Sequence, residues 1–99
     1  MPIQYVGLDN LDEKDMEKLT SISEKAYPKL ERYYPDETLV LVIKTHSKSQ
    51  GTRAKISING KIEAPKIKII AQANDWDMAK AAHKIFDKLE EEAKRKLKR

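Results

Sequence analysis

The chain has 99 residues, which is enough for a single domain built around one hydrophobic core. It contains no cysteine, so disulfides and thiolate metal sites are excluded. No apolar run approaches the roughly 18 residues of a membrane span, and the N-terminal residues lack the layout of a signal peptide. We therefore expect a cytoplasmic protein with no membrane partner. The charged fraction of 36% is typical of heat-adapted proteins.

The net charge of +4 is unevenly distributed along the chain. Residues 1–37 hold five Lys or Arg against nine Asp or Glu, a balance of −4, whereas residues 38–99 hold fifteen against seven, a balance of +8. A basic half on a small domain indicates a polyanionic partner, with nucleic acid first in line. The alternative is a solvated surface that only keeps the protein dissolved.

The first third of the chain predicts a short strand followed by a helix. The strand covers Ile3 to Leu8 and ends around Gly7. Asp12 is expected to cap the helix, because its carboxylate can accept from free amides of the first turn. We expect Pro28 to bend this helix and Pro35 to end it. The buried stripe of the helix is Met16, Leu19, Ile22, Ala26, Leu30 and Tyr33.

Two strands are predicted next, over residues 38–46 and 52–58, joined by a polar loop at 47–51. The first has Leu39, Leu41 and Ile43 on its inner face, and the second has Ala54, Ile56 and Ile58. Matching apolar residues across the pair predicts the register 43 with 54, 41 with 56 and 39 with 58.

The following connection has two interpretations. Asn59-Gly60 is a strong signal for a two-residue turn, but that turn would place apolar residues beside polar ones. A longer loop over residues 59–66 instead pairs Ile58 with Ile67, Ile56 with Ile69 and Ala54 with Ala71. We favour the longer loop, because a half-buried sheet sets its register through the buried face.

The last third predicts a strand at 66–76 and a long helix from Asp77 to Arg99. Apolar residues alternate along the strand and then recur at spacings of three and four along the helix. Asn74 is expected to cap the helix. The helical stripe is Met78, Ala81, Ala82, Ile85, Phe86, Leu89, Ala93 and Leu97.

These elements predict one α+β domain over residues 1–99, with the order β-α-β-β-β-α. A right-handed crossover places the first helix on one face of a four-stranded mixed sheet. The last helix must cover the same face to bury its stripe, which gives a two-layer sandwich with a bare sheet face.

The chain offers little for catalysis. His46 and His83 are the only histidines, and neither belongs to a Ser, Asp or metal-ligand pattern. Glu90 to Glu92 fit a helix whose glutamates pair with Lys94 and Arg95 four residues on, which argues against a metal site. No glycine-rich phosphate loop opens a helix. We therefore expect no enzyme activity, no cofactor, no metal and no small-molecule substrate.

The basic side chains are the stronger candidates for function, since they can neutralise backbone phosphates. Aromatic residues follow helix positions or flank helix ends, which favours shape recognition of a structured RNA over stacking on single-stranded bases. A further basic group is expected on the bare sheet face, at Lys44, Arg53, Lys55, Lys66 and Lys68. The candidate RNA-binding residues on the helices are Lys25, Lys29, Arg32, Lys80, Lys84, Lys88, Lys94 and Arg95.

The bare sheet face also suggests a way to self-associate. Val40, Val42 and Ile70 are apolar where water is expected, and side by side they would form a small patch. We consider this patch a possible homodimer face, and self-association without RNA binding is the alternative function.

Two segments, KLERYYPDE at 29–37 and NDWDMAKAAHKIFDKLEEEAKRK at 74–96, together with the order of elements, resemble the ribosome hibernation-promoting factor family, also described as ribosome-associated inhibitors or sigma modulation proteins. The resemblance covers nearly the whole chain and corresponds to the short form of the family. The predicted arrangement of helices and strands in this chain is similar to that of double-stranded-RNA-binding domains. The chain departs from the family pattern at Leu8, Ala82 and Glu91.

The resemblance implies a non-enzymatic protein that binds ribosomal RNA of the small subunit near the messenger and transfer RNA channels during stress. It also implies that the protein blocks translation and could promote ribosome pairing. The basic family positions match Lys25, Lys29, Arg32, Lys88, Lys94 and Arg95 of this chain.

Overall fold

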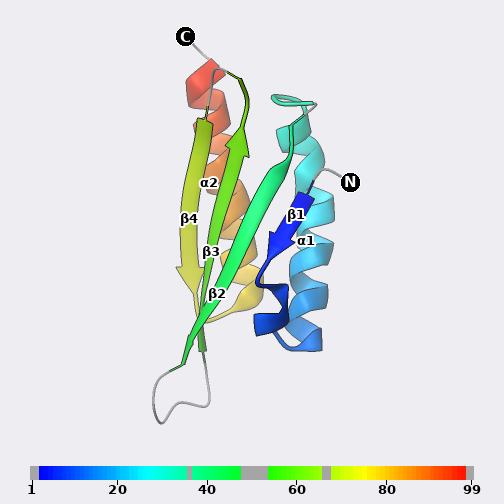
Figure 1. Cartoon of the computed structure of the whole chain (residues 1–99), viewed down its shortest axis with the longest axis vertical. Helices are drawn as coiled ribbons and strands as arrows, with labels where there is room; N and C mark the ends of the chain where they lie inside the picture. Colours follow the sequence, from blue (N-terminus) through cyan, green and yellow to red (C-terminus); the bar gives the residue numbers. More distant parts are fainter. Residues whose placement is uncertain (1–2, 36, 48–53, 66–67, 98–99) are drawn as a thin grey trace.

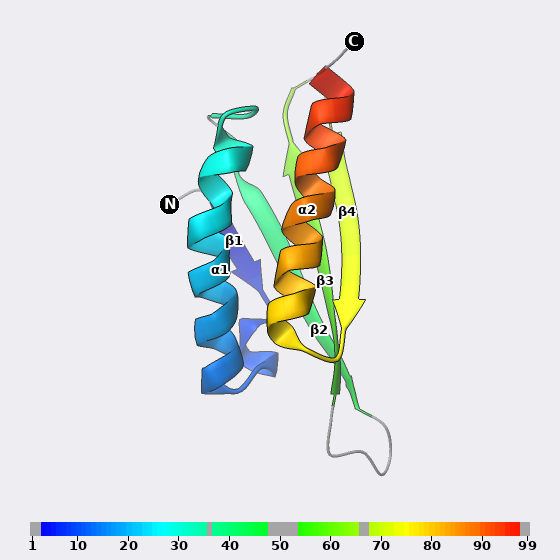
Figure 2. The ribbon, with the colours of Figure 1, turned by 180° about the vertical axis from the view of Figure 1, so that it is seen from behind.

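The computed structural model describes residues 3–35, 37–47, 54–65 and 68–97. They form one four-stranded sheet with two long helices on one face, and no described segment covers the other face (Figures 1 and 2). The described elements are β1 (Ile3–Val6), the 3₁₀-helix η1 (Leu8–Asn10), α1 (Glu13–Glu31), β2 (Leu39–Ser47), β3 (Ala54–Glu63), β4 (Lys68–Asp75) and α2 (Met78–Leu97).

The strands lie in the order β1-β2-β3-β4, with β1 parallel to β2 and the other neighbours antiparallel. Helix α2 packs on β3 and β4 and beside α1, which covers the β1 side of the sheet (Figure 2). Both helices run in the same direction, so their C-terminal ends lie at the same end of the molecule (Figure 2). The predicted α+β sandwich is confirmed. No helix in the described ranges has the length and apolar character needed to cross a membrane.

A tight turn at Gly7 ends β1. Gly7 has φ 85°, and a Cβ at this position would overlap the Ile43 carbonyl oxygen. The Asn10 side chain donates to the same oxygen at 3.1 Å, which holds η1 against β2. Strand β1 is therefore shorter than the predicted strand, because Leu8 belongs to η1.

Helix α1 begins as predicted, since the Asp12 carboxylate accepts from the Asp15 amide at 2.8 Å. It continues through Pro28 and ends at Glu31, before Pro35 is reached. The amides of Tyr33 and Tyr34 donate to the Leu30 carbonyl oxygen at 2.9 Å and 3.3 Å and close the last turn. Leu19 and Leu30 of the predicted stripe are buried, and its other members are partly buried against the core.

The register between β2 and β3 differs from the prediction. Ile43 pairs with Ile58, Leu41 with Gly60 and Leu39 with Ile62. Asn59 and Gly60 form neither a turn nor a loop, because β3 continues through them to Glu63. The helix layer accounts for a glycine within this strand: a Cβ on Gly60 would lie 2.9 Å from Leu89 Cδ1, so the glycine allows α2 to approach the sheet.

The predicted register between β3 and β4 is also wrong, because β3 extends to Glu63 and pairs with β4 further along its length. Ile62 pairs with Ile69, Gly60 with Ala71 and Ile58 with Ala73. Ile67, which the prediction paired with Ile58, lies outside the described residues. Both corrections shift the strands by an even number of residues, so the inward faces stay as predicted.

Helix α2 is capped by Asp77, whereas the prediction named Asn74. The Asp77 carboxylate accepts from the amides of Ala79 at 2.8 Å and Lys80 at 3.3 Å. Asn74 still belongs to β4 and pairs with Ser57. The side chain of Leu97 lies outside the described residues, and the rest of the predicted stripe is buried: Met78, Ala81, Ala82, Ile85, Phe86, Leu89 and Ala93.

Candidate nucleic-acid interface

Lys25 and Lys29 of α1 line a groove between the two helices, on the side away from the sheet. The groove has a volume of about 310 Å³. Across it, α2 presents His83, Asp87 and Glu90. Its apolar lining is formed by Ile22, Ala26, Leu30 and Phe86. The groove therefore has cations along one wall and carboxylates along the other.

The predicted basic residues of α1 are open to a partner. Lys25, Lys29 and Arg32 are exposed, and no described carboxylate forms an ion pair with any of them. Lys25 and Lys29 lie in the C-terminal half of α1, and Arg32 is its C-cap residue. The carbonyl end of the helix favours the positive charge of Lys29 and Arg32. An anion that approaches this end would not have to displace a bound carboxylate.

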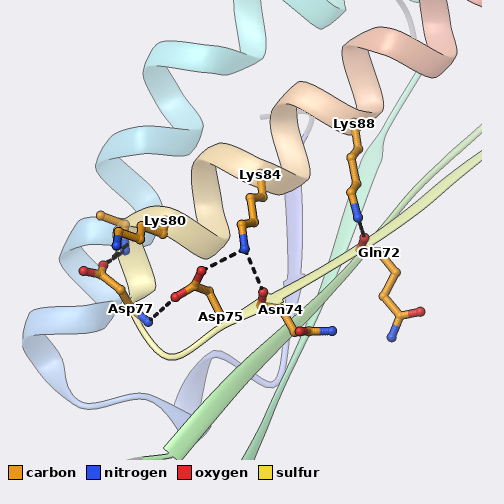
Figure 3. Close-up of polar contacts among 8 residues, drawn as sticks. Gln72, Asn74, Asp75, Asp77, Lys80, Lys84 and Lys88 are labelled. Carbon is orange, nitrogen blue, oxygen red and sulfur yellow. Dashed lines mark hydrogen bonds and ion pairs between the residues drawn. The ribbon is translucent and has the colours of Figure 1, made fainter.

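Lys84 and Lys88 are engaged with the exposed edge of the sheet. Figure 3 shows both side chains reaching from α2 to β4. The Lys84 ammonium donates to the Asp75 carboxylate at 2.8 Å and to the Asn74 carbonyl oxygen at 3.4 Å. The Lys88 ammonium donates to the Gln72 carbonyl oxygen at 2.8 Å. Since β4 is an edge strand, these lysines satisfy backbone acceptors that have no partner strand.

The contact with Lys84 changes the acidity of Asp75. Hydrogen bonds from the Lys84 ammonium and from the Asp77 amide stabilise the ionised carboxylate and lower its pKa from 3.8 to about 2. This carboxylate stays charged down to strongly acidic pH and keeps Lys84 at the strand edge.

The remaining helix residues fall on different sides of α2. Lys94 lies 3.9 Å from Glu90, which lines the helix groove. Arg95 forms an ion pair with Glu92 at 3.0 Å, whereas the sequence predicted a pair with Glu91. Lys80 is exposed and forms no ion pair with a described carboxylate. The structure thus groups Lys25, Lys29 and Lys94 near the groove, and it separates them from Lys84 and Lys88 at the edge of β4.

The bare sheet face carries part of the predicted basic group. Lys44 is exposed, and Lys55 is half-buried with its Nζ 6.0 Å from the centroid of the Trp76 ring. Lys68 lies 3.5 Å from Glu63, so its charge is partly matched. Arg53 and Lys66 lie outside the described residues.

The aromatic residues divide into two groups. Tyr27, Tyr34 and Phe86 are buried in the core, although only Phe86 belongs to a predicted stripe, and burial raises the pKa of both tyrosines. Trp76 differs, since 39% of its surface is exposed at the end of β4. The sequence pattern indicated only that Trp76 flanks a helix. Its place after an alternating strand was the signal for an outward-facing side chain.

The apolar residues of the bare face do not adjoin as expected. Lys61 of β3 pairs with Val40 on one side and with Ile70 on the other, so it separates them. Val6, which was not singled out, pairs with Val42 and is 44% exposed. The adjoining apolar residues are therefore Val6, Val40 and Val42, with Ile70 two strands away.

Among the described residues, neither histidine belongs to a catalytic or metal-binding cluster. His46 and His83 are exposed, and His83 lines the helix groove. In the described ranges, no group of three or more His, Cys, Asp or Glu side chains could hold a metal ion.

The order of elements and the placement of both helices on one sheet face define a two-layer α+β sandwich with a four-stranded mixed sheet. Two solved structures share it. A ribosomal subunit interface protein from Coxiella burnetii is 22% identical, with a TM-score of 0.64 and coverage of 100% of both chains. The N-terminal domain of Protein Y from Thermus thermophilus is 20% identical, with a TM-score of 0.58, and covers 94% of this chain and 92% of that one.

No family model and no curated protein sequence matches the chain. The likeness to the two solved structures is thus a likeness of fold, and it confirms the fold that the sequence resemblance implied.

Proposed function

We propose that this chain is a non-enzymatic, ribosome-binding factor that docks a basic surface on RNA of the small subunit and inhibits translation during ribosome hibernation. The observation that carries the proposal is the similarity of fold, over the whole chain, to a protein described as a ribosomal subunit interface protein. The sequence resemblance to hibernation factors supports the same conclusion independently of the structure.

Charge supports an RNA partner. Lys25, Lys29 and Arg32 project from one helix without a described carboxylate partner, and the chain carries a net charge of +4. When these cations neutralise RNA phosphates, the counterions condensed on the RNA are released. This release makes binding more favourable at low salt. The edge lysines Lys84 and Lys88 already donate to protein acceptors, so we place the main contacts at Lys25, Lys29 and Arg32, on the exposed side of the C-terminal end of α1.

The experiment compares two charge reversals on the same helix in a binding assay with purified small subunits. Lys25→Glu with Lys29→Glu removes the candidate cations, and Lys14→Glu with Lys18→Glu is the matched control, because both pairs are exposed and four residues apart. We expect the first variant to bind at least tenfold more weakly and the control to bind like the parent. Equal affinities for the two variants would contradict the proposed surface.

Self-association is the second candidate. It is favoured by the contact of Val6 with Val42 across β1 and β2, which places exposed apolar surface on the bare face. Sedimentation at micromolar concentration, with Val42→Lys as the variant, tests it. A dimer that the variant dissociates would support a homodimer through this face, and a monomeric parent protein would exclude it at that concentration.

A further inference from the structure

A group of polar and aromatic side chains lies on the bare sheet face, at the end where β2 and β4 stop. The group, here named the Trp76 patch, consists of Lys44, His46, Lys55, Asn74 and Trp76. The strand register brings them together: His46 pairs with Lys55, and Lys44 and Asn74 flank Ser57 on either side. Figure 1 views the molecule from this face, with the shared end of the three strands at the bottom.

The patch is positively charged because the carboxylates of the strands lie elsewhere. Among the described strand residues, the only carboxylates are Glu63 and Asp75. Asp75 is bound to Lys84 of α2 at 2.8 Å. Glu63 lies at the other end of β3, within 3.7 Å of Lys61 and 3.5 Å of Lys68. Lys44 and Lys55 therefore have no described carboxylate partner.

Trp76 adds a flat ring to this charge. Its surface is 39% exposed, and the Lys55 ammonium lies 6.0 Å from the ring centroid, at the outer limit of a cation–π contact. A cation over the ring of a partly exposed tryptophan suits a nucleotide, whose base stacks on the exposed part of the indole while its phosphate meets the cation. The exposed Asn74 amide can donate to and accept from a base edge.

We propose that the Trp76 patch binds single-stranded RNA, with one base stacked on the indole and the flanking phosphates beside Lys44 and Lys55. Duplex RNA fits the patch less well, because its bases are stacked on one another and offer no free face to the ring. The inference goes beyond the proposed function, since the patch lies on the opposite layer from Lys25 and Lys29 and needs no ribosome to be occupied.

The chain reports on this site directly, because Trp76 is its only tryptophan. Titration with single-stranded octaadenylate is expected to quench the tryptophan emission to a plateau, and raising the salt from about 50 to about 200 mM is expected to weaken the binding. A duplex of the same length and polyglutamate are the comparison ligands. No quenching by octaadenylate, or an equal response to either comparison ligand, would overturn the proposal.

Variants then locate the site, with a fluorescently labelled octaadenylate and anisotropy as the readout. Trp76→Ala and Lys55→Ala are each expected to weaken binding by about tenfold, whereas Trp76→Tyr retains most of it. Lys14→Ala on α1 is the matched lysine control and should change nothing. Thermal unfolding of each variant verifies that it is folded. Unchanged affinity in both alanine variants would overturn the proposal.

The assay with purified small subunits distinguishes binding at the Trp76 patch from the proposed ribosome binding. The variant Lys25→Glu with Lys29→Glu should bind octaadenylate like the parent while losing affinity for small subunits. Loss of both activities in this variant would contradict two independent surfaces.

Discussion

The Lys88 ammonium donates a 2.8 Å hydrogen bond to the Gln72 carbonyl oxygen, which joins α2 to the exposed edge of β4 (Figure 3). Lys84 repeats the arrangement one turn earlier, at Asn74. Unpaired edge strands are templates for pairing with another chain. The two lysines therefore both attach the helix to the sheet and cover backbone acceptors that would otherwise invite aggregation.

The first prediction concerns this edge. Lys84→Ala with Lys88→Ala is expected to lower the free energy of unfolding by roughly 0.5 to 1 kcal/mol per lysine, because exposed contacts of this kind are partly screened by water. We also expect more self-association at high concentration. Denaturant unfolding and light scattering measure the two effects, with Lys14→Ala and Lys18→Ala as the control. A stable, monomeric double variant would show that the contacts contribute nothing.

The same contacts complicate a test of RNA binding at these positions. Charge reversal of Lys84 and Lys88 would place two carboxylates against backbone carbonyl oxygens and disturb the edge of β4. A loss of affinity in such a variant could reflect instability, so Lys25 and Lys29 provide the cleaner test.

The second prediction follows from the acidity of Asp75. Its pKa is about 2 in the folded protein and near 3.8 when the chain is unfolded. The unfolded state therefore binds the proton more readily, and the stabilisation from this carboxylate is present above pH 4 and is lost as the pH falls from about 4 to about 2. Asp75→Asn should show a shallower loss of stability over this range in urea unfolding. Identical pH profiles for the parent and the variant would refute the assignment.

The third prediction tests why Asn59 and Gly60 lie within a strand. Gly60→Ala is expected to lower the free energy of unfolding by about 1 to 3 kcal/mol, because the new methyl group overpacks against Leu89. The effect should shrink when Leu89→Ala is added, a coupling that a double-mutant cycle measures. Asn59→Ala, on the outer face, is the control. Purely additive costs would exclude the contact with Leu89 as the cause.

The fourth prediction concerns the start of α2. Asp77→Ala should cost about 1 kcal/mol of stability, because two amides of the first turn lose their acceptor. Asn74→Ala should cost less, since Asn74 lies in β4 with its side chain exposed. Chemical unfolding of the two variants compares them. The reverse order would favour Asn74 as the cap.

Periodicity predicted which residues are buried more reliably than it predicted which residues pair. Leu39, Leu41 and Ile43 alternate with polar or partly exposed neighbours, and the structure buries all three. The register was wrong because apolar residues match one another equally well after an even shift. Gly60 lies inside β3 against Leu89, a residue 29 positions away that no local pattern connects to it.

In the candidate site, too, local patterns predicted exposure but not the contacts between elements. Lys25 and Lys29 were predicted to be exposed from their helix positions, and they are. Local patterns could not show that Lys84 and Lys88 reach the sheet, because that contact depends on how α2 crosses β4. Val6 and Trp76 were missed for a similar reason, since their exposure depends on the strand order and on the bare face.

In the function proposed here, the basic surface of this protein binds phosphates of the small ribosomal subunit. The most direct measurement is the affinity for purified small subunits at salt concentrations from about 50 to about 200 mM. Each phosphate contact contributes roughly 0.7 to 0.9 to the magnitude of the slope of log affinity against log salt, so contacts by Lys25, Lys29 and Arg32 together predict a slope steeper than about −2. Tight binding with a slope near zero, or no binding at the lowest salt, would contradict the claim.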